Sequence, residues 1–133
     1  MWSIIVVEPA LSWLHGLRRT DRKTLRLVSR AIEALSVEGP ALGRPLVDTI
    51  KGSALSNLKE LRPGSAGASE VRLLFVFDSQ RQAVILVAGD KAGNWRRWYK
   101  TAVPQAETAY ADHLVWMTKQ EGGRGHERPP GGS

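Results

Sequence analysis

The segment EVRLLFVFDSQRQAVILVAG (Glu70–Gly89) decides the fold of this chain. It contains two apolar runs, rich in β-branched and aromatic residues and separated by a short polar turn, and this pattern is typical of a β-hairpin. We therefore predict one strand at Glu70–Asp78, a Ser-Gln-Arg turn, and a second strand at Gln82–Gly89. Strands this apolar need other elements to cover them.

The rest of the sheet is predicted from two other segments. SNLKELR (Ser56–Arg62) is typical of a strand that ends at Pro63-Gly64, and the flexible link Gly64–Ser69 joins it to the hairpin. SIIVVE (Ser3–Glu8) is β-branched and uninterrupted, which predicts a strand buried on both faces. Between these two strands, Ala41–Lys51 is expected to be irregular.

Three helices are predicted around this sheet. Pro9 suits the first turn of one helix, where its missing N–H costs nothing. Thr20 is expected to cap the second helix, with Asp21 in its first turn. Gly39-Pro40 ends that helix, and Pro104 begins the last one. The second helix has one apolar stripe, formed by Leu25, Val28, Ile32 and Leu35.

The order of these elements is β-α-α-β-β-β-α. We therefore expect an α+β fold in which a compact mixed or antiparallel sheet is packed by two N-terminal helices and a C-terminal helix. A length of 133 residues is typical of one domain, which we expect to span residues 1–120. The segment EGGRGHERPPGGS (Glu121–Ser133) has no residues that form a core and is expected to be a disordered tail.

Composition excludes several classes of chemistry. The chain has no Cys, which excludes disulfides, thiolate catalysis and zinc sites built on cysteine. Its carboxylates and three His are scattered without the spacing of ligands, so we expect neither a metal site nor another cofactor. The first apolar run, Ile4–Val7, is too short for a signal peptide or a membrane span. We expect a cytoplasmic protein with no membrane partner.

Cations and aromatic rings are concentrated after the hairpin. The chain has 19 Lys and Arg against 13 Asp and Glu, a formal net charge of +6, which favours a polyanionic partner. The segment AGDKAGNWRRWYK (Ala88–Lys100) combines two Trp and one Tyr with Arg96, Arg97 and two Lys. Flat rings beside fixed positive charges are suited to the bases and phosphates of RNA. Trp95 is expected to anchor this loop in the core.

Further basic residues lie in the predicted strands. Arg72 interrupts an otherwise apolar strand, so its guanidinium must reach solvent, a carboxylate or a bound anion. Strand alternation puts Arg62 on the same face as Glu60, and Lys59 on the opposite face. Two interpretations stay open. Either Glu60 and Arg72 form a cross-strand ion pair while Lys59 and Lys91 are solvated, or the basic residues form a surface that binds an anion.

Four segments, in this order, carry a family resemblance: KELR (Lys59–Arg62), VRLLFVFD (Val71–Asp78), VAGDKAGNWRRWY (Val87–Tyr99) and P-x-A-x-x-x-Y-x-x-H-L (Pro104–Leu114). Together they resemble the phage Gp49-like, HigB-type branch of the RelE/ParE toxin superfamily. The resemblance implies the toxin of a type II toxin–antitoxin system, an endoribonuclease that cuts mRNA on the ribosome and so inhibits translation. It also implies a cognate helix-turn-helix antitoxin as a partner, beside the ribosome and mRNA.

The resemblance further implies roles for individual residues. In metal-independent cleavage the 2′-hydroxyl of the RNA attacks the neighbouring phosphate, and the protein moves protons and neutralises charge. Arg72 would bind the scissile phosphate. Lys91 would act as base or acid, with a pKa lowered by neighbouring cations. Tyr99 would stack on a base or relay a proton. The other expected RNA contacts are Lys59, Arg62, Arg96, Arg97 and Trp98.

Two alternatives to cleavage stay open. ParE-like members of the superfamily poison DNA gyrase and do not cut RNA, and a phage-derived protein could bind nucleic acid without cutting it. The joint presence of Arg72, Lys91 and Tyr99 favours cleavage. No His enters this group of residues, which leaves the general base open, and the sequence alone does not predict an oligomeric state.

Overall fold

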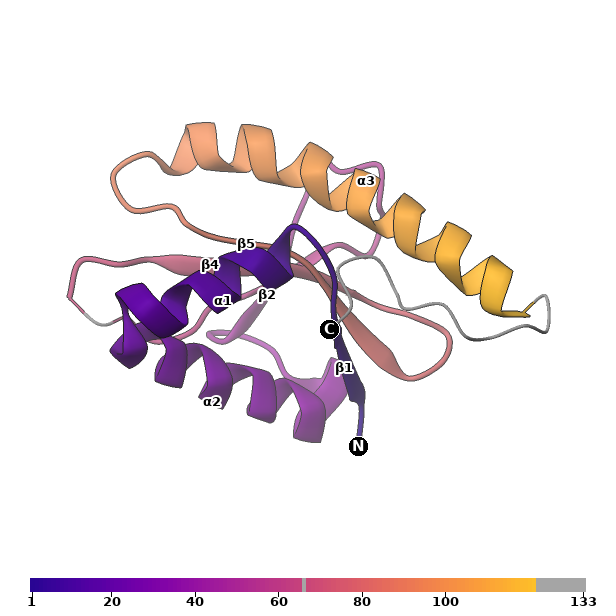
Figure 1. The fold of residues 1–133 in the computed structure, drawn as a ribbon, viewed down its shortest axis with the longest axis horizontal. Coiled ribbons are helices and arrows are strands. Elements are labelled where there is room, and N and C mark those ends of the chain that lie inside the picture. The colour runs from indigo at the N-terminus through magenta and orange to yellow at the C-terminus, as the bar shows by residue number, and fades with distance from the viewer. Residues whose placement is uncertain (66, 122–133) are drawn as a thin grey trace.

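Residues 1–65 and 67–121 are described by the computed structural model (Figure 1). Apart from residue 121, which ends the last helix, the tail predicted over 121–133 lies outside the described residues. The domain boundary predicted at residue 120 stays a prediction. The elements in chain order are β1 (Ser3–Val6), α1 (Ala10–Thr20), α2 (Arg22–Glu38), a short 3-10 helix (Gly39–Ala41), β2 (Val47–Thr49), β3 (Lys59–Leu61), β4 (Val71–Phe77), β5 (Gln82–Asp90) and α3 (Trp95–Glu121).

The predicted hairpin, β4 and β5, forms the centre of a five-stranded sheet with the order β1-β5-β4-β3-β2. β1 runs parallel to β5, whereas the other neighbouring strands pair antiparallel. Most residues of β4 and β5 are buried, because each has a strand on either side and helices cover the sheet. The predicted α+β architecture is therefore confirmed, with one strand more than expected.

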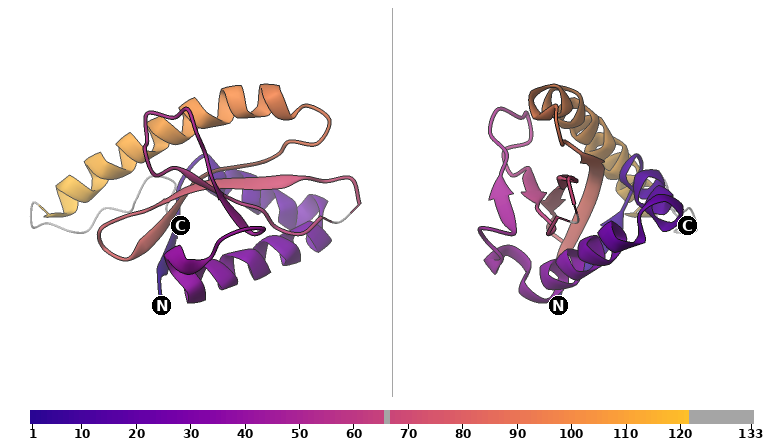
Figure 2. Two further views of the ribbon diagram at one scale, coloured as in Figure 1. Left: turned by 180° about the vertical axis from the view of Figure 1, so that it is seen from behind. Right: turned by 90° about the vertical axis from the view of Figure 1, so that its left-hand side faces the viewer.

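Helices cover both faces of the sheet. α1 and α2 lie on one face, and α3 crosses the other (Figures 1 and 2). Side chains alternate along β4, so Leu73 and Phe75 pack in the core beneath α1 and α2, whereas Leu74 and Val76 pack in the core beneath α3. Arg72 precedes Leu74 by two residues and therefore lies on the α3 face.

Two predictions about strands are wrong in part. β1 is not buried on both faces: Ile4, Ile5 and Val6 are half-buried, because β1 is an edge strand with β5 as its one neighbour. The stretch 41–51, expected to be irregular, contains β2. Three residues are too few to show a strand pattern of their own, and β2 is a strand because it pairs with β3.

The second helix begins later than expected, because Asp21 and not Thr20 caps it. Asp21 Oδ1 accepts a hydrogen bond from the Thr24 backbone N–H at 3.1 Å, and Asp21 Oδ2 accepts one from the Thr24 hydroxyl at 2.5 Å. Both bonds satisfy groups at the start of the helix and lower the pKa of Asp21. Thr20 instead ends α1, where its hydroxyl donates to the Gly16 carbonyl.

The last helix begins at Trp95, well before Pro104, which lies inside it. A proline inside a helix removes one backbone hydrogen bond and is therefore more common at a helix start. Here the first turns of α3 are held by packing: Trp98, Tyr99 and Val103 contact the core beneath α3. Much of the aromatic and basic segment after β5 is thus helical, which fixes where its side chains point.

Candidate functional site

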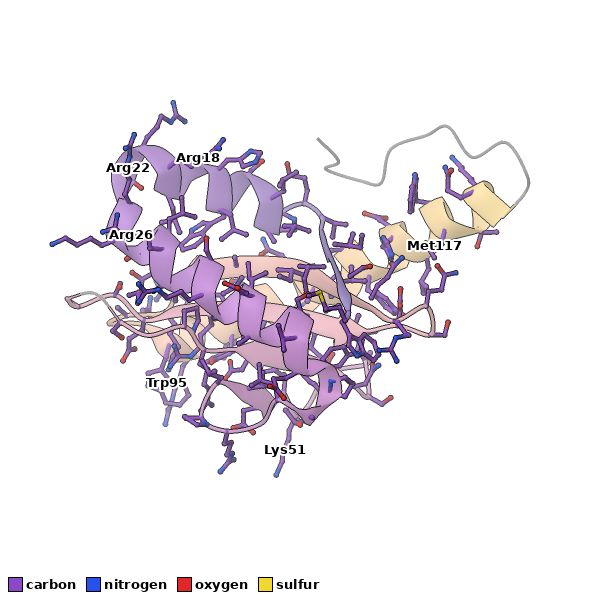
Figure 3. The ribbon with its side chains drawn as sticks, turned by 90° about the horizontal axis from the view of Figure 1, so that it is seen from below. Arg18, Arg22, Arg26, Lys51, Trp95 and Met117 are labelled. Atoms are coloured by element: carbon purple, nitrogen blue, oxygen red, sulfur yellow. The ribbon has the colours of Figure 1, made fainter. Side chains whose placement is uncertain are left out.

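A groove of about 490 Å³ lies between β2, β3 and the first turns of α3. Its lining combines cations, carboxylates and aromatic rings with two aliphatic side chains. The lining residues are Arg44, Asp48, Thr49, Ile50, Lys51, Glu60, Arg62, Trp95, Tyr99 and Val103. Trp95 and Lys51 both extend from the body of the protein in the view from below (Figure 3). A groove in which cations slightly outnumber carboxylates and a ring is exposed is compatible with single-stranded nucleic acid.

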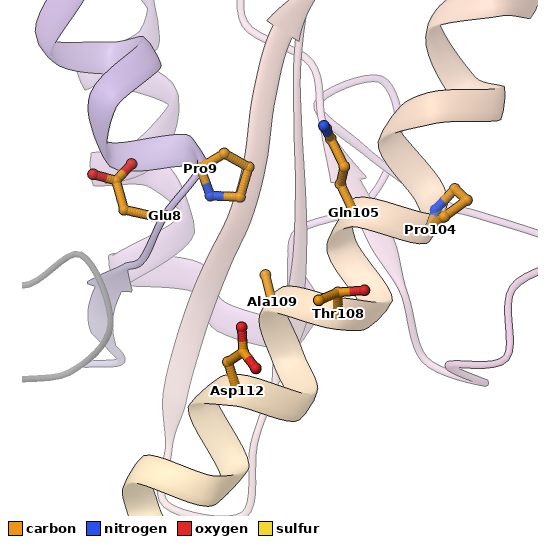
Figure 4. Close-up of a pocket in the computed structure, with 7 residues that line it drawn as sticks. All are labelled: Glu8, Pro9, Pro104, Gln105, Thr108, Ala109 and Asp112. Atoms are coloured by element: carbon orange, nitrogen blue, oxygen red, sulfur yellow. The ribbon is translucent and has the colours of Figure 1, made fainter.

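A second hollow, of about 320 Å³, lies between the start of α1 and α3 (Figure 4). Its charged side chains are the carboxylates of Glu8 and Asp112. Glu8 is already occupied, because its two oxygens accept hydrogen bonds from the backbone N–H and the hydroxyl of Ser12. A hollow with this charge does not suit an anionic ligand, so the groove beside β3 is the better candidate of the two for the predicted anion site.

Glu60 is the centre of a polar network at the base of the groove. Only 2% of this residue is exposed. Its Oε1 atom accepts a hydrogen bond from Arg62 Nε at 2.8 Å, and its Oε2 atom accepts one from the Tyr99 hydroxyl at 2.5 Å. Arg62 Nη2 also lies 3.2 Å from Asp48 Oδ2, which in turn pairs with Arg44 at 3.2 Å. We call these five residues the Glu60 network.

The network sets the protonation of its members. Burial, together with the hydrogen bond to Glu60, raises the pKa of Tyr99 well above its usual value, so this phenol keeps its proton at neutral pH. The Thr49 backbone N–H and then Arg44 lower the pKa of Asp48. Burial alone would lower the pKa of Arg62, but the hydrogen bond and charge of Glu60 outweigh burial and raise it.

Arg72 lies on the same face of the sheet, close enough for its charge to act against the raised pKa of Tyr99. Its Nη1 donates to the Val71 carbonyl at 2.8 Å, whereas its buried Nε has no hydrogen-bond partner among the described residues. The ion pair between Glu60 and Arg72 that the sequence left open is absent from the described part of the chain, where Glu60 binds Arg62 and Tyr99. A buried guanidinium N–H without a partner suits an anionic ligand.

Lys91 approaches the same tyrosine from the end of β5. Its ammonium lies 5.9 Å from the centre of the Tyr99 ring and 3.9 Å from Glu70 Oε2. The neighbours of Lys91 are thus a ring and a carboxylate, and not the cluster of cations expected from the sequence. Arg72, Lys91 and Tyr99, which we predicted as catalytic, are therefore brought together around one phenol, and their role in catalysis stays a prediction.

The burial of the two Trp residues of the segment differs from what we predicted, and the contact of Trp98 with RNA stays a prediction. Trp95, expected in the core, is 54% exposed and lines the groove, with the Arg96 guanidinium 5.2 Å from its ring centre. Trp98, expected to stack on a base, is half-buried against β5 because Gly89 leaves room for its indole. The helical start of α3 explains both positions, since it turns Trp98 towards the sheet. Arg97 is exposed, and its contact with RNA stays a prediction.

Gly89 gives a first test of this packing. A Cβ atom at Gly89 would lie 2.4 Å from Trp98 Nε1, so we expect Gly89→Ala to displace the indole and lower the free energy of unfolding by about 1–3 kcal/mol. Chemical denaturation measures the change. Gly16→Ala in α1 is the matched control, since nothing lies within 4 Å of its Cβ and alanine favours a helix. Equal stability of Gly89→Ala and wild type would contradict the contact.

Lys59 is separated from the other predicted site residues. It points to the opposite face of β3 from Glu60, and its Nζ lies 3.5 Å from Thr49 Oγ1 at the margin of the groove. Sequence reasoning missed Arg44, Asp48 and Lys51 as groove residues, because they belong to a segment without a recognisable pattern. It considered Glu60 only as a partner for Arg72.

Comparisons with known proteins agree with this fold. Residues 15–111 match the family described as phage-derived Gp49-like proteins. The candidate toxin HigB2 of Mycobacterium tuberculosis (strain ATCC 25618 / H37Rv) is 56% identical over 109 residues, which are 82% of this chain and 53% of HigB2. This chain therefore spans about half the length of that relative. The candidate toxin HigB3 of the same organism is 42% identical over 121 residues, 91% of this chain and 98% of HigB3.

Among solved structures, a chain of the YoeB dimer from Staphylococcus aureus is similar, with a TM-score of 0.51 and 17% sequence identity. The similarity covers 63% of this chain and 90% of the YoeB chain, and at this identity it concerns the fold. Within the described residues, none of the helices combines the length and the apolar character that crossing a bilayer requires.

Proposed function

This chain belongs to the phage-derived Gp49-like family, with HigB-type toxins among its relatives, and from this membership we propose that it is a toxin that cuts mRNA on the ribosome. Its partners are a cognate antitoxin of the helix-turn-helix type, the ribosome and mRNA, and it acts in the cytoplasm. The observation that carries the proposal is the hydrogen bond between Tyr99 and buried Glu60, at the wall of a groove with cations and an exposed ring.

The nucleophile in this proposal is the 2′-hydroxyl of the RNA. Tyr99 acts as a relay: its oxygen accepts the proton of the 2′-hydroxyl while its own proton passes to Glu60 Oε2, which already accepts the phenol hydrogen bond at 2.5 Å. A phenol with a raised pKa does not act as a preformed phenolate base, so the transfer needs Glu60. Glu60 thereby supplies the proton acceptor that the sequence did not identify.

Arg72 and Lys91 complete the reaction. As the bond between O2′ and phosphorus forms and the bond between phosphorus and O5′ breaks, negative charge grows on the phosphate oxygens. The unpartnered Nε of Arg72 donates to these oxygens. The Lys91 ammonium, beside the Tyr99 ring, gives its proton to the leaving 5′-oxygen. The products are a 2′,3′-cyclic phosphate and a 5′-hydroxyl, and no atom of a metal or cofactor is needed in this scheme.

The groove holds the RNA around the scissile bond. Trp95 offers an exposed ring on which a base stacks, and the aliphatic Val103 and Ile50 continue that wall. Arg44, Lys51 and Arg62 line the same groove and bind neighbouring phosphates. Arg96 and Arg97 at the start of α3 and Lys59 at the margin add positive charge along the path of the strand.

Expression without antitoxin gives the first test of this function. We expect growth arrest, loss of translation, and mRNA fragments whose upstream pieces end in a 2′,3′-cyclic phosphate or a 3′-phosphate. Sequencing that distinguishes these ends from a 3′-hydroxyl measures the outcome. Fragments with 3′-hydroxyl ends would contradict attack by the 2′-hydroxyl. The ParE-like alternative predicts a different result for the Tyr99→Phe variant. In that case growth arrest would persist, mRNA would stay intact and gyrase would be inhibited.

A further inference from the structure

A second cationic surface lies at the corner where α1 meets α2, away from the groove. Residues 18–30 contain six cations and one carboxylate, a formal charge of +5 in a chain whose net charge is +6. All six cations are exposed, and they are Arg18, Arg19, Arg22, Lys23, Arg26 and Arg30. We call this surface the basic corner. Arg18, Arg22 and Arg26 extend outward in Figure 3, far from Trp95 and Lys51.

The cations of the basic corner form no ion pair within the part of the chain that the structure describes, although hydrogen bonds from Thr24 and then the nearby charge of Lys23 lower the pKa of the Asp21 carboxyl. The ion pairs recorded there involve Arg44, Arg62 and Lys91. Within the corner, Arg22 Nε donates a hydrogen bond to the Arg18 carbonyl at 3.3 Å. Arg18, Arg22 and Arg26, with Leu25, surround a hollow of about 270 Å³, so three guanidinium groups border one site.

The position of these charges opposes helix stability. Arg22 and Lys23 occupy the first turn of α2, where the helix dipole disfavours cations, and the one carboxylate beside them is the N-cap Asp21, which is already hydrogen-bonded to Thr24. Arg22, Arg26 and Arg30 follow one another at intervals of four residues, a spacing at which like charges repel. A bound polyanion would relieve both effects. We therefore infer that the basic corner is a ligand site and not only a solvated surface.

We propose that the basic corner binds the phosphate backbone of paired RNA, while the groove takes the single strand to be cut; this rests on the function proposed above. Residues 18–30 contain no aromatic side chain on which a free base could stack. None of the large exposed apolar side chains, Met1, Val37, Trp95, Leu114 and Val115, belongs to the corner. With Leu25 as the one aliphatic side chain around its hollow, this surface lacks the large apolar centre typical of protein interfaces and has the charge typical of nucleic-acid interfaces.

The test compares two variants with the same change in charge. Arg22→Gln/Arg26→Gln removes two cations from the corner, and Lys100→Gln/Lys119→Gln removes two exposed cations from α3 that do not line the groove. Each full-length protein is titrated by fluorescence anisotropy with a fully paired RNA hairpin and with an unpaired single strand, at several salt concentrations. Gln favours a helix nearly as well as Arg, and circular dichroism checks the fold.

We expect the corner variant to lose affinity for the hairpin and to lower the slope of log affinity against log salt by about two. The factor by which the corner variant binds the hairpin more weakly than wild type is then about tenfold larger at 50 mM than at 200 mM salt. The α3 variant should bind the hairpin as wild type does, and the corner variant should melt at a higher temperature in low salt. Equal hairpin binding by the two variants, or loss of antitoxin binding alone, would overturn the proposal.

The same titrations separate this proposal from the proposed function. Tyr99→Phe should bind the hairpin as wild type does while losing cleavage. If Tyr99→Phe cuts mRNA normally but the corner variant still loses the hairpin, the catalytic scheme is wrong and the basic corner stands. If Tyr99→Phe is inactive and the corner variant binds both RNAs normally, the catalytic scheme stands and the basic corner is not an RNA site.

Discussion

Arg72→Ala is expected to lower the rate of mRNA cleavage by about 10²–10³-fold, or roughly 3–4 kcal/mol of activation free energy, while the protein stays folded. The loss arises because the guanidinium stabilises the negative charge of the transition state. Its Nε has no hydrogen-bond partner within the described residues and is therefore available to the phosphate. Arg72→Ala also removes the hydrogen bond from Nη1 to the Val71 carbonyl, so the free energy of unfolding should fall by about 1 kcal/mol, too little to unfold the protein. Single-turnover cleavage on programmed ribosomes measures the rate.

Two further variants make this result specific. Arg72→Lys keeps the charge but loses the planar fork of donors, and should recover only part of the rate. Lys119→Ala removes an exposed cation at the end of α3 and should cleave as wild type does. Binding of the ribosome should be similar for all of these proteins. A folded Arg72→Ala protein with the wild-type rate would show that Arg72 is not the catalytic arginine.

Glu60→Ala is expected to have the largest effect on stability, a loss of about 3 kcal/mol in the free energy of unfolding. Removal of one partner from a buried ion pair costs about 3–5 kcal/mol. The lower end applies because the Arg62 side chain is 35% exposed and still has Asp48 as a partner. The Tyr99 hydroxyl also loses its acceptor. Denaturant titration measures the change, and cleavage should be lost as well.

Glu70→Ala is the matched control for stability. The Glu70 side chain is 48% exposed, and its pair with Lys91 is 3.9 Å long, so its removal should change stability by about 1 kcal/mol or less. Glu60→Gln separates structure from chemistry: it should keep most of the stability and still lose cleavage, because an amide does not take the proton from Tyr99. Cleavage by Glu60→Gln at the wild-type rate would rule out the relay.

Much of the fold is predictable from local patterns, and the site is less so. β4 and β5 are long, apolar and bounded by turns, so their sequences predict strands without any knowledge of what packs against them. β2 has three residues and becomes a strand only through β3. The start of α3 was misplaced because Pro104 is a common start signal, whereas the contact of Trp98 with Gly89 that holds the earlier turns is visible only in three dimensions.

The candidate site likewise contains residues that the sequence identifies and residues whose place is visible only in the structure. The family resemblance, together with the cationic and aromatic residue types, selects Arg72, Lys91 and Tyr99, which lie together. The role of Glu60 was hidden because its hydrogen-bond partner Tyr99 is distant in sequence and belongs to another element. Exposure of Trp95 and burial of Trp98 depend on the helical phase of α3, which no pattern in the segment specified.

The parallel pairing of β1 with β5 has a consequence for the way the ribosome makes this protein. Of the strands in this sheet, β1 is synthesised first, and it pairs with β5, which is synthesised last, with Ser3 opposite Gln82 and Val6 opposite Ile85. The sheet therefore cannot close until β5 has been synthesised. Tyr99 and Trp95 emerge later still, so a nascent or truncated chain has no groove. If the molecule is toxic, as we propose, the cell that makes it meets that toxicity only after β5 and the start of α3 have both been synthesised.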